Sequence, residues 1–233
     1  MSTSPRRRPA TRKGRPVLTR EAIAAKALEM AGREGFRSIT MRALATELDV
    51  TVRALYNYVE DRQEVVDLAV TQMLAAWNPP ALEPGDWQAS AAAYARSLRE
   101  LYRRWPRALL IALEEDAPPT SIHPNRLLHL DRYLAFLRKV GLTLPAAIEV
   151  HRHQSLLVLS FALMVDQPTG PGPTSRSPLV PGTWLNAHAD LDLPVLREAA
   201  ALEPPTPDEQ FTALIEAVLT LIRAHLPGER CAS

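Results

Sequence analysis

The chain repeats one helix-start pattern three times between residues 18 and 59. In each copy an apolar residue precedes a threonine, and a second apolar residue stands four positions after the threonine. Threonine is a good N-cap because its hydroxyl accepts a hydrogen bond from an otherwise unpaired backbone N–H. The two apolar residues pack together and fix the angle at which the chain enters the helix. The copies are Leu18-Thr19 with Ile23, Ile39-Thr40 with Leu44, and Val50-Thr51 with Leu55.

The second and third predicted helices must meet at a sharp angle. We expect helices over about 20–32, ending at Gly32, over 41–48 and over 52–58, so only a few residues separate the last two. Two short helices joined by such a turn are typical of a helix-turn-helix, whose second helix enters the major groove of double-stranded DNA. Residues 18–62 are therefore predicted to be a three-helix DNA-binding domain.

The third helix carries side chains suited to reading bases. Arg53 can donate two hydrogen bonds to a guanine, and Asn57 can pair with an adenine. Val52 offers a methyl surface to thymine. Leu55 and Val59 are predicted to point the other way, into the core of the domain.

Positive charge is concentrated at the N-terminus. Of the 27 basic residues, seven stand before the first acid, Glu21, which leaves 20 against 26 acidic residues in the rest of the chain. We expect residues 1–17 to be a disordered basic arm. The arm, Arg15 included, either lies in the minor groove beside the recognition helix or serves only as a solubilising tail.

Beyond residue 62 the apolar residues recur at helical spacing, and no period-two strand pattern is convincing. The predicted fold class is all-α. Further helices are expected over about 61–77, 87–105, 107–115, 127–140, 145–165 and 211–226, with a linker at 79–86 and a loop at 166–182. Residues 156–165 and 211–226 are apolar on more than one face, which favours a homodimer through a four-helix bundle over a purely internal core.

Residues 18–69 resemble the N-terminal domain of TetR-family transcriptional regulators. The resemblance is carried by the segments GREGF, ITMRALA and LYNYVEDRQEVVDLA. Two positions depart from the family: Asp49 stands where the turn usually has glycine, and Arg62 where lysine is usual. Asp tolerates a left-handed turn conformation better than most residues, and Arg62 keeps the positive charge.

The resemblance implies that residues 63–228 bind a small-molecule effector and dimerise. It also implies a repressor of palindromic operator DNA. Phosphate contacts are expected, through side chains or helix N-termini, from Thr40, Arg42, Thr51, Tyr56, Tyr58 and Arg62. Plain packing between helices remains the alternative for the two tyrosines.

An effector cavity is expected to be mostly apolar with a few polar groups. Candidate liners, each with ordinary core packing as the alternative, are Trp77, Tyr94, Leu98, Trp105, Leu109, Leu110, Phe136, His151, Gln154, Phe161 and Trp184. Four tryptophans suggest an aromatic or lipophilic effector. Trp77-Asn78 stands where tetracycline repressors carry a histidine pair, which disfavours a tetracycline–magnesium effector.

Other protein classes find little support. No histidine has Glu or Asp three positions earlier, as a di-metal helical enzyme requires, and no phosphate loop, nucleophile elbow or zinc spacing occurs. We expect no enzyme activity, cofactor or metal. No segment approaches the roughly 20 apolar residues of a membrane span, and the single cysteine, Cys231, forms no internal disulfide. A cytoplasmic protein is expected. The remaining alternative is a helix-turn-helix regulator without an effector.

Overall fold

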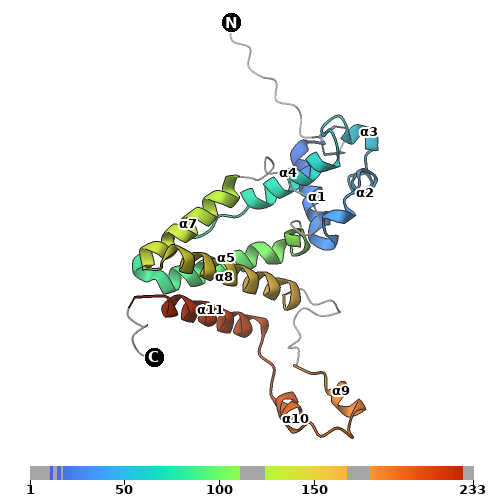
Figure 1. Ribbon diagram of the computed structural model, residues 1–233. Coiled ribbons are helices and arrows are strands. Elements are labelled where there is room, and N and C mark those ends of the chain that lie inside the picture. The colour runs from blue at the N-terminus through green and yellow to red at the C-terminus, as the bar shows by residue number, and fades with distance from the viewer. Residues whose placement is uncertain (1–10, 13–14, 17, 111–123, 167–178, 228–233) are drawn as a thin grey trace. The chain divides into compact units, whose positions relative to one another are not determined.

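The fold described here is that of a computed structural model of the 233-residue chain. The structure describes residues 11–12, 15–16, 18–110, 124–166 and 179–227. The described residues are predominantly helical, as predicted (Figure 1). They form two compact units, one of Met1–Asn78 with Arg107–Arg126, the other of Pro79–Pro106 with Leu127–Ser233.

The first unit contains the predicted helix-turn-helix. Its helices are α1 (Arg20–Glu34), α2 (Met41–Glu47), α3 (Val52–Leu55) and α4 (Arg62–Ala75), with 3-10 turns η1 (Phe36–Ser38) and η3 (Arg107–Leu110). The long helices α1 and α4 pack against each other, and α2 packs against α3. The core includes Ile23, Phe36, Leu44, Leu55 and Val65, all fully buried.

All three predicted threonine caps are confirmed. The hydroxyls of Thr19, Thr40 and Thr51 accept hydrogen bonds from backbone N–H groups three residues ahead, at 3.1, 3.1 and 3.2 Å. The helix starts were therefore fixed by local chemistry that the sequence displays.

Helix ends differ more from the prediction. The prediction that the first helix stops at Gly32 is wrong, because α1 continues to Glu34 and ends at Gly35, whose φ of 86° no helical residue adopts. Regular helix in α3 stops at Leu55, and hydrogen-bonded turns follow it through Tyr58. Helix α4 ends at Ala75, short of Trp77.

The predicted domain boundary at residue 62 assigns the fourth helix to the C-terminal domain. In the structure α4 packs on α1 and groups with the first unit, so the compact units divide after Asn78.

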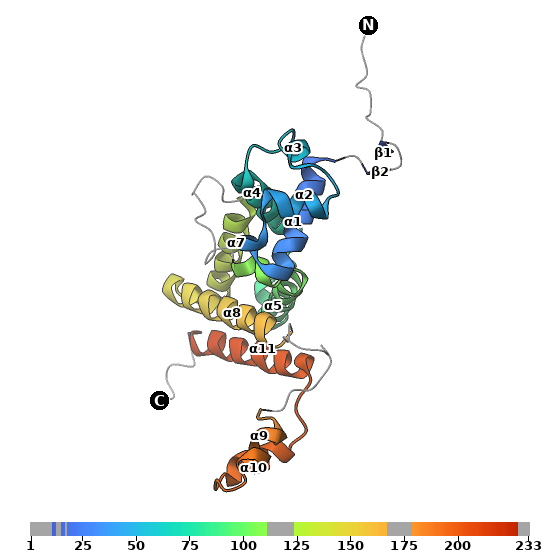
Figure 2. The ribbon, with the colours of Figure 1, turned by 90° about the vertical axis from the view of Figure 1, so that its right-hand side faces the viewer.

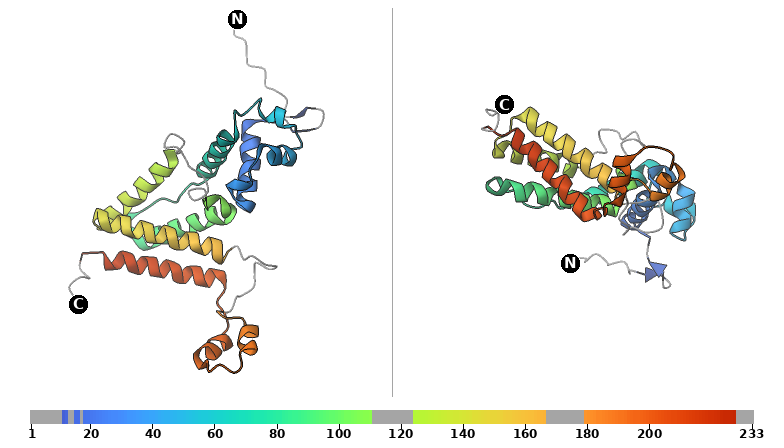
Figure 3. Two further views of the ribbon diagram at one scale, coloured as in Figure 1. Left: turned by 45° about the vertical axis from the view of Figure 1, so that its right-hand side comes forward. Right: turned by 90° about the horizontal axis from the view of Figure 1, so that it is seen from below.

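The second unit is built on a layer of long helices. Its elements are η2 (Pro84–Asp86), α5 (Trp87–Arg104), α7 (Pro124–Val140), α8 (Leu144–Met164), α9 (Gly182–Ala187), α10 (Pro194–Ala201) and α11 (Pro207–Ala224). Helices α8 and α11 run antiparallel and side by side, and both contact α5 (Figure 3). Helix α7 ends at Gly141, as predicted, with a φ of 119°.

An ion cluster, buried at Arg99 and Asp166 but exposed at Asp208, joins three of these helices. The guanidinium of Arg99 on α5 donates two hydrogen bonds to Asp166, at 2.8 and 2.7 Å, and one to Asp208 at 2.9 Å. It also lies over the rings of Phe161 and Phe211, which meet edge to face. Hydrogen bonding to Asp166 raises the pKa of Arg99. The cluster fixes the C-terminal end of α8 and the start of α11 on α5.

Three features were not predicted. Thr206 and Glu209 form a reciprocal capping box at the start of α11, and α9 and α10 are short helices with no side-chain cap. In the arm, the structure describes a two-residue antiparallel pair, β1 (Thr11–Arg12) with β2 (Arg15–Pro16) (Figure 2). None of the described helices is long and apolar enough to cross a membrane.

Candidate functional site

The turn between α2 and α3 is set by a left-handed residue. Asp49 has a positive φ of 52°, and no other described residue except glycine has a positive φ. Around it the N–H of Val50 donates to the carbonyl of Ala45 at 3.0 Å, and the N–H of Asp49 donates to Thr46 at 3.1 Å. This pair of bonds is the Schellman motif, in which glycine usually holds the left-handed position. Asp49 thus performs the task expected of the family's glycine.

The turn leaves one face of α3 in solvent and buries the other. Arg53 and Asn57 are exposed, whereas Leu55 and Val59 are almost fully buried. Neither Arg53 nor Asn57 forms a side-chain hydrogen bond or ion pair with any other described residue. Their donors and acceptors are therefore available to an external partner.

Arg20 supports the far end of this segment. Its guanidinium donates to the carbonyl oxygen of Tyr58 at 2.7 Å and forms an ion pair with Glu64 of α4. Hydrogen bonds to the Glu64 carboxylate, first from the N–H of Glu60 and then from Arg20, lower its pKa. These contacts join α1, the turn after α3 and the start of α4.

Arg62 has a structural role that the sequence did not reveal. Its side chain donates from Nε to the carbonyl of Ile39 at 2.7 Å and from Nη2 to that of Phe36 at 2.8 Å. The planar fork of a guanidinium suits two such bonds. Arg62 therefore holds the connection before α2 against α4, and its predicted phosphate contact stays a prediction.

The other residues predicted to contact phosphate lie at the same helix-turn-helix. Thr40, Arg42, Thr51 and Tyr56 are exposed, and Tyr58 and Val52 are half-buried. For Arg15 the structure describes only the backbone, in β2.

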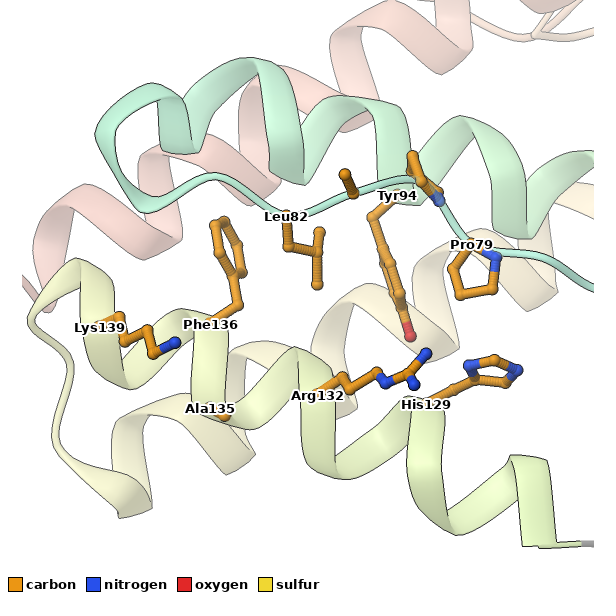
Figure 4. Close-up of a pocket in the computed structure, with 10 residues that line it drawn as sticks. Pro79, Leu82, Tyr94, His129, Arg132, Ala135, Phe136 and Lys139 are labelled. Atoms are coloured by element: carbon orange, nitrogen blue, oxygen red, sulfur yellow. The ribbon is translucent and has the colours of Figure 1, made fainter.

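The second unit contains a pocket of about 350 Å³ that is partly open to solvent. One wall is the linker, residues 79–82, which follows α4 along the chain, and Tyr94 projects from α5. The opposite wall is α7, through His129, Arg132, Ala135, Phe136 and Lys139 (Figure 4).

An aromatic stack supports the pocket from behind. Tyr94 lies on Tyr133 of α7 with ring centroids 4.0 Å apart and an interplanar angle of 12°. The Tyr133 hydroxyl donates to Oε1 of Gln154 on α8. Burial raises the pKa of both tyrosines, so both stay neutral at physiological pH. The stack gives the pocket one rigid aromatic surface.

Of the eleven predicted ligand residues, the pocket brings together Tyr94 and Phe136. Gln154 and His151 lie behind it, around Tyr133, and burial lowers the pKa of His151. Leu98 and Phe161 are buried elsewhere, Trp77 and Trp105 are half-buried, and Trp184 is 66% exposed. The side chains of Leu109 and Leu110 lie outside the described residues.

The cationic liners Arg132 and Lys139 and the linker wall were not predicted from the sequence. On an amphipathic helix such residues look like an ordinary solvated face. Their spacing of seven residues, which places them on one side of α7, is the only signal that the sequence offers.

Fold and site together define a helix-turn-helix protein with a helical C-terminal domain. Family models agree: residues 23–68 match the bacterial regulatory proteins of the tetR family, and residues 79–225 match the tetracyclin repressor-like C-terminal domain. The chain belongs to the TetR family of transcriptional regulators. This membership places it with DNA-binding regulators rather than with enzymes.

Individual relatives support the same assignment. The chain is 32% identical over 143 residues to the HTH-type transcriptional repressor DrrR1 of Streptomyces coeruleorubidus, across 61% of this chain and 51% of that protein. It is 30% identical over 98 residues to an HTH-type transcriptional regulator of Saccharopolyspora erythraea, across 42% of each. The matched region thus spans about half the length of these relatives.

Among solved structures, the chain resembles the Streptomyces coelicolor TetR family protein ActR in complex with actinorhodin. The TM-score is 0.65 at 25% identity, over 89% of this chain and 98% of ActR.

Proposed function

We propose that this protein is a ligand-responsive repressor that binds a palindromic operator as a homodimer and is released by a small-molecule effector. It would act in the cytoplasm, where its operator DNA lies. The observation that carries the proposal is the exposure of Arg53 on the capped helix α3 and of Asn57 in the turn after it, while Leu55 and Val59 on the opposite side are buried. DrrR1 is described as a repressor and ActR was solved with actinorhodin, which supports a repressor with an effector.

Exposed apolar side chains on α8 support the proposal that the protein is a homodimer. Leu156, Leu157 and Met164 are 64%, 40% and 80% exposed, and the first and last lie eight residues apart on one helix face. Beside α8, helix α11 turns the small residues Ala213, Ala217 and Thr220 outwards. Two such helices from each of two subunits would form a four-helix bundle about a two-fold axis.

The pocket in the second unit supports the proposal that a small-molecule effector binds this protein. Its volume falls within the range of small-molecule sites, and rigid aromatic and apolar groups line it beside a few polar ones. The linker wall, residues 79–82, begins four residues after α4 ends at Ala75. An effector that repositions the linker would therefore shift α4. Through Arg20 and Arg62, α4 is bonded to the helix-turn-helix. Effector and DNA would then weaken each other's binding reciprocally.

Replacing Arg53 with alanine tests the DNA-binding proposal. We expect the affinity for the operator to fall by about 5- to 150-fold and the preference at one base position to relax, because a bidentate contact to a base is worth about 1–3 kcal/mol. The operator is first selected from a random DNA library, and affinity is then measured by fluorescence anisotropy.

The matched control is Arg96→Ala, which removes an exposed arginine from α5 in the second unit. This variant should bind the operator like the parent protein. Equal affinity and unchanged base preference in the Arg53 variant would refute the assigned role. Failure of the parent protein to select any DNA would refute the function as a whole.

A further inference from the structure

We propose that the pocket takes an amphipathic anion, a molecule with a flat apolar body and a carboxylate or similar oxyanion at one end. The inference rests on the proposed function and deepens it by naming the chemical class of the effector. It depends on the charges along α7, the aromatic surface opposite them and the opening of the pocket to solvent.

The charges that line the pocket are all of one sign. Arg132 and Lys139 contribute two cations, and no aspartate or glutamate lines the pocket. Among the described residues, neither cation forms a hydrogen bond or ion pair through its side chain. The nearest acids along the chain, Asp131 and Glu83, do not line the pocket, so the formal charge of its lining is positive.

Apart from His129 and the Tyr94 hydroxyl, the remaining lining is apolar, and it includes a flat surface. Phe136, Leu82 and Pro79 supply apolar area, and Tyr94 presents a ring held in place by its stack on Tyr133 (Figure 4). Planar rings pack on such surfaces by offset stacking or edge-to-face contact. A flat ligand body therefore fits beside Tyr94 better than a branched one.

The position of the cations decides where the anionic group lies. Both side chains are exposed, whereas Tyr94 and Phe136 are buried, so we place the anionic group on the solvent side of the pocket. An anionic group placed at the rim keeps much of its hydration while it gains the attraction of two cations. A neutral ligand lacks this attraction, and a cationic ligand is repelled.

Naphthalene-2-carboxylate and its neutral carboxamide are suitable probes, because they share one flat body and differ in charge. Isothermal titration calorimetry of the full chain should give an affinity at least about 10-fold higher for the carboxylate at low salt, as contacts to charged groups are worth more than neutral ones. The difference should shrink as sodium chloride is raised to 0.5 M, where exposed charges are screened.

The double variant Arg132→Gln and Lys139→Gln removes both cations. We expect it to lose most of the preference for the carboxylate while its affinity for the carboxamide changes less than about 2-fold. Each single variant should lie between the double variant and the parent protein. The control is Arg138→Gln, on the same helix and exposed but outside the lining, and it should keep the full preference.

Three results would overturn the inference: neither probe binds, both bind equally, or the control loses the preference as fully as the double variant. Thermal unfolding of every variant should match the parent, since all three side chains are exposed. Selection of operator DNA is measured separately. A protein that binds its operator but ignores both probes would refute the anion class and leave the regulator standing, whereas a protein that selects no DNA would refute the proposed function.

Discussion

At the scale of single residues, the α2–α3 turn depends on the backbone conformation of Asp49. A left-handed conformation places Cβ close to the following carbonyl, at a cost of about 1–2 kcal/mol for ordinary residues. Asp and Asn tolerate it better than other non-glycine residues. The two hydrogen bonds around Asp49 close the end of α2, so the conformation cannot relax without losing them.

Asp49→Val is therefore expected to destabilise the protein. A β-branched residue in this conformation is a true outlier, and we expect the free energy of unfolding to fall by about 1–2 kcal/mol. Urea denaturation followed by circular dichroism measures the change.

Asp49→Asn is the control, because asparagine shares the tolerance for a left-handed backbone, and it should stay within about 0.5 kcal/mol of the parent. Equal stability of the valine and asparagine variants would show that the turn does not depend on the left-handed conformation.

At the scale of elements, Arg62 links the start of α4 to the segment that leads into α2. Its Nε and Nη2 donate hydrogen bonds to the backbone carbonyls of Ile39 and Phe36. A lysine at this position keeps the charge but has no planar fork, so it cannot reproduce both bonds in the same geometry.

Arg62→Lys and Arg62→Gln separate a structural role from a phosphate contact. We expect both variants to lose about 1–3 kcal/mol of stability, because both leave a carbonyl without its charged donor. Denaturant unfolding measures this loss. A lysine variant with the stability and operator affinity of the parent would contradict the structural role.

Arg42→Gln provides the comparison for that experiment. Arg42 is exposed on α2, and its side chain is expected to contact phosphate only. Its replacement should leave the free energy of unfolding within about 0.5 kcal/mol and lower operator affinity and its salt dependence.

Element starts were easier to predict from the sequence than element ends. A cap is a hydrogen bond between a threonine hydroxyl and the backbone N–H three residues ahead, so it depends only on nearby residues. Thr19, Thr40 and Thr51 therefore indicate where their helices begin. Gly32 was taken as a helix end, but a glycine also fits inside a helix at a modest cost. Only the backbone at Gly35 shows which glycine ends α1.

Tertiary contacts decided what the sequence could not. The α9 and α10 helices lack side-chain caps, and only α10 has a start signal, the proline in its first turn. For the pocket, whether a ring faces a cavity depends on which segment packs against it, and the sequence does not show this. Tyr94 lines the pocket because the linker and α7 pass beside it, whereas Trp184 remains exposed.

At the scale of the whole molecule, recognition of a palindromic operator depends on two helix-turn-helix domains, one from each subunit. One helix-turn-helix contacts one half-site. A palindrome is bound by a dimer whose two recognition helices are about 34–36 Å apart. The proposed bundle would cover the exposed leucines of α8, Leu156 and Leu157. In an isologous interface both subunits contribute the same surface, so the copies of these leucines in both subunits would be buried.

Leu156→Glu should therefore disrupt the dimer of this 25.8 kDa chain. Each substitution would bury two carboxylates near the two-fold axis, and we expect the dimer dissociation constant to rise at least about 100-fold. Sedimentation equilibrium measures it, and binding to a full palindrome should fall to the level of a half-site. The control is Leu127→Glu on α7, because Leu127 is 61% exposed against 64% for Leu156. If the Leu127 variant dissociates and the Leu156 variant stays dimeric, the subunits meet through α7 rather than through α8 and α11.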